Sequence, residues 1–302
     1  MALSVRLHSQ LASRKFVEAL DRLAISVSVF SLTGLILNAI NPLVHYKRWR
    51  DQATIDSVLN LCLNEKRKQT HPNNLGSEKP LNGDIFDIAF QANDLPHRMI
   101  LDQLRSIFVA GHDSTAATMS WIYYFLYWSP NALLRIRQEH DEVFGVNTTP
   151  ADVAAQLIAD PKLHIKLEFT LAVVKESLRL EPPASSPREP TKNYHFTTST
   201  GRTYAPPEGS MIYLSAWILH RNKALWGEDA EKFIPQRFMP GRTIPWGYIP
   251  FSKRPRDCVG SYLALLECKI ILALTIRRFD FEPSIPFVRV VRGTVSSPFW
   301  CG

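Results

Sequence analysis

Cysteine is scarce in this 302-residue chain, which contains four: Cys62, Cys258, Cys268 and Cys301. They are too few and too scattered for a disulfide framework, and none belongs to a C-x-x-C pair. The sequence therefore argues against a disulfide-stapled fold and against a structural zinc site. We expect a reducing environment that faces the cytosol. The role of each cysteine therefore depends on its local sequence surroundings.

Charged residues are also modest in number, at 21% of the chain against 45% hydrophobic residues. This ordinary globular composition excludes wholesale disorder, a collagen-like repeat and a multi-span membrane protein. Lys and Arg (35) exceed Asp and Glu (28) by 7, a mild excess that suits an acidic partner or a membrane surface. Nucleic acid is not an expected partner, because no recognition motif or interleaved aromatic platform accompanies the basic residues.

We expect no secretory leader in these residues, since the first fifteen are polar and basic with no apolar core behind them. The longest uncharged run covers 23–44 and has roughly the length of a membrane span. It contains several Ser, Thr and Asn residues as well as Pro42. We therefore favour a buried helix over a membrane span, and leave membrane association open.

Helical periodicity dominates the rest of the chain. The pattern predicts helices over 14–40, 47–69, 131–144, 151–157, 162–180 and 259–277. Between Pro96 and Pro130 lies an apolar stretch that, as one helix, would run on the order of 50 Å through a core. Short strands are expected over 181–211, and 212–222 is helical or extended. The sequence predicts a mainly α fold with a minor β component, in a single domain over 1–302.

The first motif that carries chemistry is FSKRPRDCVG, residues 251–260. Cys258 precedes an apolar helix, whose N-terminal dipole and free N–H groups favour a thiolate. Gly260 leaves room for a large planar group to approach the backbone. One interpretation is a haem-iron thiolate ligand, with Arg256 pairing with a haem propionate. The other is a buried, inert cysteine, which is the usual case for a lone cysteine.

The second motif is AGHDST, residues 110–115, within the long helix. Gly111 costs roughly 1 kcal/mol relative to Ala in a helix interior, and an Asp inside a core needs a partner or water. Such a local conflict is typical of a functional site. Asp113 with the hydroxyls of Ser114 and Thr115 could hold a water and relay protons into a dry pocket. The alternative is a helix kink with satisfied side chains.

The third motif is KESLRLEPP, residues 175–183, in which Glu176 and Arg179 share one helix face. An exposed pair of this kind contributes little. The pair would matter only if it were buried with another partner, and Arg237 in EKFIPQRF is the candidate. Taken alone, E-x-x-R occurs by chance in most proteins.

In this order, the three motifs resemble the cytochromes P-450, the haem-thiolate monooxygenases. The cysteine pattern of that family, F-x-x-G-x-R-x-C-x-G, is matched by Phe251, Arg256, Cys258 and Gly260. The pattern of the long helix, A/G-G-x-D/E-T-T, is matched by Ala110, Gly111, Asp113, Ser114 and Thr115. The P-E-R-F box falls on Pro235, Gln236, Arg237 and Phe238, in a stretch (220–238) that is similar to this family throughout. In its general character the sequence resembles the fungal members of this family in particular.

The resemblance implies a cytochrome P-450 fold in three regions. Residues 1–95 would be helices on the substrate side, 96–282 the haem-binding core and 283–302 a divergent tail. Members of the family usually run to about half as long again or more. We therefore expect an incomplete chain that lacks N-terminal helices and the membrane anchor.

The resemblance also implies a role for each matched position. Haem would be bound with the thiolate of Cys258 as axial ligand of the iron. The other cofactor-binding residues would be Arg256, Arg188, Phe251, Gly260 and Gly111, the two arginines through the haem propionates. Proton delivery to dioxygen would fall to Asp113 with Ser114 or Thr115. A buried network bracing the cysteine loop would contain Glu176, Arg179 and Arg237. The substrate pocket would be lined in part by Phe108, Val109 and Ala110.

The activity implied is the insertion of one oxygen atom from dioxygen into an apolar small molecule, as a step of fungal secondary metabolism. Two electrons would come from an NADPH-dependent reductase. The family usually sits on the cytosolic face of the endoplasmic reticulum membrane, whereas a chain complete as given would be soluble in the cytoplasm. The alternative function is a truncated, non-catalytic relative that binds haem poorly or not at all.

 A role in fungal secondary metabolism is inferred from the general similarity of the sequence to fungal members of the family and not from any single residue.

Two departures from the family pattern change what is expected locally. Arg254 stands where the cysteine loop of the family has Gly, and Arg would be strained there if the site needs a positive φ. Ser114 stands where the family usually has Thr, so the hydroxyl is kept but the methyl that fixes its rotamer is lost. The basic cluster Lys253, Arg254 and Arg256 is interpreted as a docking face for an acidic reductase.

Overall fold

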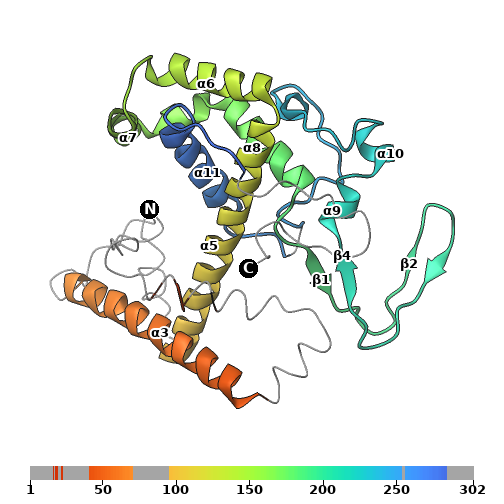
Figure 1. Cartoon of the computed structure of the whole chain (residues 1–302). Coiled ribbons are helices and arrows are strands. Elements are labelled where there is room, and N and C mark those ends of the chain that lie inside the picture. Colours follow the sequence, from red (N-terminus) through yellow and green to blue (C-terminus); the bar gives the residue numbers. More distant parts are fainter. Residues whose placement is uncertain are drawn as a thin grey trace. The chain divides into compact units, whose positions relative to one another are not determined.

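The computed structural model describes Phe16, Glu18, Ala19, Arg22 and the ranges 41–70, 95–253 and 256–283; over 65–70 only the backbone is described. The chain divides into two compact units, Met1–Asp113 and Ser114–Gly302. Helix α5 (His97–Tyr127) begins in the first unit and ends in the second (Figure 1). The predicted helix over 14–40, the tail 284–302 and Arg254 lie wholly or mostly outside the described residues.

The first unit contains α3 (Pro42–Thr70) and the beginning of α5. Helix α3 begins five residues earlier than the 47–69 pattern predicts, because Asn41 caps it: its side-chain oxygen accepts a hydrogen bond from the Leu43 amide at 3.0 Å. Pro42 suits the first helical position, where its missing N–H is not needed. The core of this unit comes from one face of each helix: Ile55, Leu59, Leu63, Leu101 and Leu104.

The run 23–44 falls almost entirely outside the described residues, so its expected burial in a helix stays a prediction. Among the helices that the structure does describe, none combines the length and the apolar character needed to cross a membrane.

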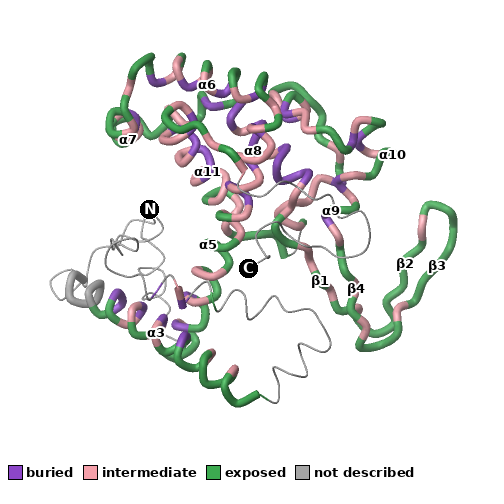
Figure 2. The backbone as a smooth tube through the Cα atoms, in the orientation of Figure 1, coloured by how far each residue is buried: buried purple, intermediate pink, exposed green. Residues whose placement is uncertain are grey.

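In the second unit, four helices surround the main hydrophobic core: the end of α5, α6 (Pro130–Phe144), α8 (Glu168–Leu180) and α11 (Ser261–Thr275). Met119 and Ile122 of α5 pack there with Val173 of α8 and Leu272 of α11. Buried positions cover most of α8, whereas on α6 they recur on one face (Figure 2). The burial of α8 on nearly all sides makes it the centre of this unit.

The segment 162–180 was expected to be one helix, and this is wrong. It divides at Leu167 into a 3₁₀ helix, η1 (Pro161–Lys166), and α8. The carboxylate of Glu139, on α6, accepts hydrogen bonds from the amides of Phe169 (2.5 Å) and Thr170 (2.9 Å). These amides belong to the first turn of α8, so a side chain from another helix fixes where α8 begins.

The helix α7 (Pro150–Ala159) shows the opposite case, in which local sequence sets the boundary. The hydroxyl of Thr149 accepts a hydrogen bond from the Asp152 amide, and the Asp152 carboxylate accepts one from the Thr149 amide. This capping box, with Pro150 at the first helical position, starts the helix one residue before the pattern predicts.

Strands are few and short within the described ranges. Strand β1 (Ser186–Arg188) pairs antiparallel with β4 (Ile212–Leu214), and β2 (Phe196–Thr197) pairs antiparallel with β3 (Thr203–Tyr204) (Figure 1). Three short helical elements follow: α9 (Ala216–Leu219), α10 (Lys223–Trp226) and the 3₁₀ helix η2 (Pro235–Phe238). The predicted fold class, mainly α with a minor β component, is confirmed.

Candidate functional site

Cys258 lies in a turn immediately before α11, whose N-cap is Gly260. The Cys258 amide donates a hydrogen bond to the Phe251 carbonyl at 2.9 Å, and the Ser261 amide donates to the Cys258 carbonyl at 3.3 Å. The first bond closes the loop 251–258, which we call the cysteine loop. The second joins this loop to the first turn of α11, so the backbone on both sides of Cys258 is held.

The three cysteines in the described ranges differ in accessibility. Cys258 is exposed, whereas Cys62 and Cys268 are buried. Burial raises the pKa of the Cys268 thiol to about 12, so that thiol stays protonated and unreactive at neutral pH. Cys258 is not buried, so the expectation of a buried cysteine at this position is wrong.

The surroundings of this sulfur fit a large, flat and mostly apolar group such as haem. Val259 is 98% exposed, and Tyr262 and Leu263 in the first turn of α11 are also exposed. A Cβ atom at Gly260 would lie 3.9 Å from the Cys258 sulfur, an ordinary van der Waals contact, so Gly260 directly borders the thiol. Haem of this kind needs one cysteine that a ligand can reach and apolar residues beside it, and Cys258 and its exposed neighbours meet both requirements.

Arg188 and Phe251 hold the cysteine loop from the side of the protein. The guanidinium of Arg188 donates a hydrogen bond to the Ser252 hydroxyl at 3.0 Å, which places this arginine against the loop. Ser252 has a φ of +63°, a left-handed conformation that is uncommon for a residue other than glycine. Phe251 packs its half-buried ring on the main core. Arg256, the other expected propionate ligand, is exposed.

Glu176 and Arg179 form a fully buried ion pair. Arg179 Nε lies 2.7 Å from Glu176 Oε2, and Arg179 Nη2 lies 2.8 Å from Glu176 Oε1, so the pair is bidentate. Glu176 also accepts a hydrogen bond from the Ile234 amide at 2.8 Å, and Arg237 Nε lies 3.6 Å from Glu176 Oε1. Burial raises the pKa of Glu176, and the bonds from Arg179 oppose that rise. The structure thus brings the three network residues together.

The remaining N–H groups of Arg179 reach backbone carbonyls of a segment far along the chain. They donate to His220 (2.8 Å), Ala230 (2.6 Å) and Lys232 (2.9 Å). Removing one member of a buried pair leaves an uncompensated charge. In the intact pair, every N–H group of the Arg179 guanidinium donates a hydrogen bond. One side chain therefore orders the backbone at three points of the segment 220–232.

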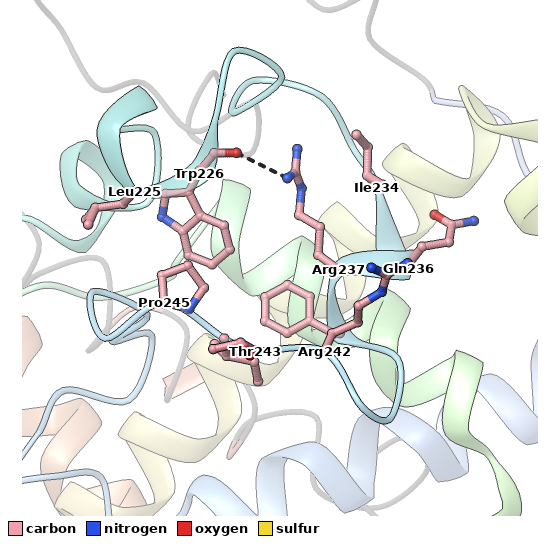
Figure 3. A pocket seen from close by; sticks show the side chains of 10 residues that line it. Leu225, Trp226, Ile234, Gln236, Arg237, Arg242, Thr243 and Pro245 are labelled. Atoms are coloured by element: carbon pink, nitrogen blue, oxygen red, sulfur yellow. Dashed lines mark hydrogen bonds between the residues drawn. The ribbon is translucent and has the colours of Figure 1, made fainter.

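Arg237 extends the network to the surface. Its guanidinium donates to the Trp226 carbonyl at 3.2 Å and to the Asp229 carbonyl at 2.8 Å, and it holds the pKa of the Asp229 carboxyl below its usual value. Trp226, Arg237 and Pro245 are among the residues that line a pocket of about 340 Å³ (Figure 3). None of the residues expected to bind the cofactor lines this pocket.

The residues of the AGHDST motif occupy consecutive positions of α5, which runs through them as an uninterrupted α-helix. Gly111 and Asp113 are exposed, and Ser114 and Thr115 are half-buried. The Thr118 hydroxyl donates to the Ser114 carbonyl at 2.8 Å, a bond of the kind that lets a helix carry hydroxyl residues. Because Asp113 is exposed, its side chain does not need the buried partner or water that an Asp inside a core would require.

Two of the three residues expected to line a substrate pocket pack in the core of the first unit. Phe108 meets Phe16 edge to face, with ring centroids 5.9 Å apart, and Val109 packs against the same cluster. Ala110 is exposed. A role for these residues in binding substrate stays a prediction.

Sequence reasoning missed His220, which lies between Arg179 and the residues leading to the cysteine loop. It is fully buried and uses both ring nitrogens in hydrogen bonds, to the Arg179 carbonyl and the Ile249 amide. A lone histidine has no local signal for such a role. The one available sign was its position at the start of the stretch 220–238, which resembles the family.

Comparison with known proteins gives one family. The sequence model described as "Cytochrome P450" matches residues 3–287. The chain is 31% identical over 273 residues to "Cytochrome P450 monooxygenase acrF" of Aspergillus aculeatus, covering 80% of this chain and 53% of that protein. It is 30% identical over 298 residues to "Cytochrome P450 monooxygenase polC" of Polytolypa hystricis, covering 91% of this chain and 51% of that protein.

A plant relative is similar over a shorter stretch. "Cytokinin hydroxylase" of Arabidopsis thaliana is 37% identical over 190 residues, which is 62% of this chain and 34% of that protein. The chain spans about half the length of the two fungal relatives that it matches. With the family model matching almost the whole sequence, this chain belongs to the cytochrome P450 family.

Proposed function

We propose that this protein is a haem-thiolate monooxygenase that inserts one oxygen atom from dioxygen into an apolar small molecule. The observation that carries this proposal is the exposed Cys258 thiol, held just before α11 on a loop that a backbone bond to Phe251 closes. Membership of the family and the monooxygenase names of the two fungal relatives support it. The fungal origin of these relatives supports a role in secondary metabolism.

Haem, when bound, supplies an iron centre that activates dioxygen, with a thiolate that favours O–O cleavage. Cys258 provides that thiolate, and the N–H groups at the start of α11 stabilise its negative charge. Arg188 and Arg256 pair with the two propionates, for which a guanidinium has the right bidentate geometry. Arg188 then links the cofactor to Ser252 and hence to the cysteine loop.

Proton delivery falls to Asp113 with the hydroxyls of Ser114 or Thr115. The Asp113 carboxyl is exposed and can exchange protons with water, while the two hydroxyls that follow it are half-buried. A carboxyl and a hydroxyl at consecutive positions can hold a water and pass a proton through it. Serine at 114 rotates more freely than threonine, which makes this step less ordered.

An NADPH-dependent reductase supplies two electrons and docks on the basic cluster. Lys253 and Arg256 are exposed, as a docking face requires, and Arg254 lies outside the described residues. Complementary charge speeds the encounter of such partners. By resemblance to the family, we place the protein at the cytosolic face of the endoplasmic reticulum membrane.

A carbon monoxide difference spectrum of the reduced, haem-loaded protein tests the proposal. We expect the red-shifted Soret band of thiolate-ligated haem for the native chain and for Cys268→Ala, and its loss for Cys258→Ala. Absence of the band from the native chain, with an identical spectrum for Cys258→Ala, would overturn the enzyme assignment. That result would favour a relative without catalytic activity.

A further inference from the structure

We propose that His220 is a positioning residue that holds the cysteine loop on the buried Glu176–Arg179 pair, acting through the backbone of Ile249. The inference rests on the proposed function, because it gives His220 a part in presenting Cys258 to haem. The contacts that define this clamp lie entirely within the second unit. They can be tested with or without the cofactor.

One side of the clamp is a pair of hydrogen bonds between His220 and Arg179. Arg179 Nη1 donates to the His220 carbonyl at 2.8 Å, and His220 Nδ1 donates to the Arg179 carbonyl at 2.9 Å. Both residues are fully buried. Because Arg179 belongs to α8, these two bonds make the imidazole ring move whenever α8 moves.

The other side of the clamp is the Ile249 amide, which donates to His220 Nε2 at 2.8 Å. A carbonyl can only accept and an amide N–H can only donate, so the proton must be on Nδ1 and Nε2 must be free. The ring is thus neutral in one defined tautomer. Burial lowers the pKa of His220 to about 4, which keeps the ring neutral under physiological conditions.

Two short backbone links join Ile249 to Cys258. The Ile249 carbonyl accepts a hydrogen bond from the Ser252 amide at 3.0 Å, and the Phe251 carbonyl accepts one from the Cys258 amide at 2.9 Å. Only Pro250 separates Ile249 from Phe251, and its ring restricts the chain between them. A displacement of Ile249 is therefore transmitted to the carbonyl that closes the cysteine loop.

Packing holds the imidazole ring in the orientation that both bonds need. It stacks on Tyr248, with ring centroids 5.4 Å apart, and meets Trp226 edge to face at 6.3 Å. The Tyr248 hydroxyl in turn donates to the Lys175 carbonyl of α8 at 3.0 Å. At Gly247, a Cβ atom would come within 2.8 Å of a Leu225 methyl, so this segment also approaches α10 closely.

Two substitutions separate the two sides of the clamp. In His220→Asn, the side-chain amide nitrogen replaces Nδ1 and keeps the bond to Arg179, but nothing reaches the Ile249 amide. In His220→Gln, the side-chain oxygen reaches the place of Nε2 and keeps the bond from Ile249, but the donor to Arg179 is lost. A role through the cysteine loop makes His220→Asn the more damaging change.

His140 provides a matched control. It is fully buried, like His220, and its pKa is likewise lowered to about 4. Its Nε2 bonds with the Thr170 hydroxyl at 2.8 Å, between α6 and α8. His140→Asn and His140→Gln therefore report the general effect of replacing a buried imidazole in the same unit.

The first measurement is hydrogen–deuterium exchange over 246–258 in the full chain, before and after haem is added. We expect His220→Asn to speed exchange of the Ile249 amide roughly tenfold, as the loss of one buried hydrogen bond predicts. His220→Gln and both His140 variants should leave it close to the native rate. Unchanged exchange in His220→Asn, or an equal increase in His140→Asn, would overturn the inference.

The second measurement is the lifetime of the red-shifted carbon monoxide band in the haem-loaded variants. We expect this band to decay several-fold faster in His220→Asn than in His220→Gln or His140→Asn. Equal lifetimes in His220→Asn and His140→Asn would contradict a positioning role. If the native chain shows no such band, the proposed function fails, and the exchange of Ile249 in the haem-free chain still decides whether the clamp exists.

Discussion

Arg179 and His220 exchange two hydrogen bonds, each donating from its side chain to the backbone carbonyl of the other, at 2.8 and 2.9 Å. The two residues are 41 positions apart in the sequence and both are fully buried. This relationship joins the most buried helix of the second unit to the segment that leads to the cysteine loop. Arg179 thereby serves both the ion pair with Glu176 and the position of that segment.

Removing the acid of the buried pair should destabilise the protein strongly. In Glu176→Gln the Arg179 guanidinium stays buried without a counter-charge, and such a loss typically costs 3–5 kcal/mol of unfolding free energy, so we expect about that decrease. Urea unfolding of the two chains measures it. Glu228→Gln breaks an exposed pair with Lys223 and should have no measurable effect. Equal stability of Glu176→Gln and the native chain would contradict a structural role for the pair.

The two buried histidines should make the protein less stable in acid. The pKa values of His140 and His220 are lowered by burial to about 4, below the usual 6.5 of an unfolded chain. The unfolded state therefore binds more protons between these values, and stability is fully present above pH 6.5 and is lost as the pH falls toward 4. For each ring the loss is on the order of 3 kcal/mol.

Urea unfolding of the haem-free chain at several pH values measures this dependence. In His220→Gln and His140→Gln the slope between pH 6.5 and 4 should be smaller than in the native chain. His195 is exposed, and His195→Gln serves as the control that keeps the native slope. A native slope in all three variants would show that the buried rings do not titrate as described.

Asp113→Asn should lower turnover with dioxygen by roughly 10²- to 10⁴-fold, the range for loss of a general acid or base. The carbon monoxide band should be unchanged, because Asp113 is not part of the cysteine loop. Asp102→Asn, at an exposed position of the same helix, is the control that retains turnover. The measurement is product formed per enzyme per minute, and native turnover in Asp113→Asn would refute the proton-delivery role.

Charge reversal at Lys253 and Arg254 should slow the transfer of electrons from the reductase. It should also flatten the dependence of that rate on salt, because attraction between the partners would no longer be there to screen. Stopped-flow reduction at several salt concentrations measures both effects. Lys162→Glu changes an exposed lysine of η1 and should leave the rate unaltered; unchanged rates in the Lys253 and Arg254 variant would exclude this docking face.

The local pattern located the helices, although α3 begins five residues and α7 one residue before the predicted starts. The capping box of Thr149 and Asp152 and the cap at Asn41 are written within a few residues of the helices that they start. The break at Leu167 could not be found in this way. It depends on the Glu139 carboxylate, about thirty residues away in the sequence, at the first turn of α8.

The sequence by itself determined the three motifs, their order and the mainly α fold, since residue types and spacing over a few turns suffice for each. Only the tertiary structure decided that Cys258 is exposed while Cys268 is buried, and that Glu176, Arg179 and Arg237 meet. It alone revealed His220 between Arg179 and Ile249. The physical reason is that burial and hydrogen-bond partners depend on segments that are distant in the chain and become neighbours only when the core is packed.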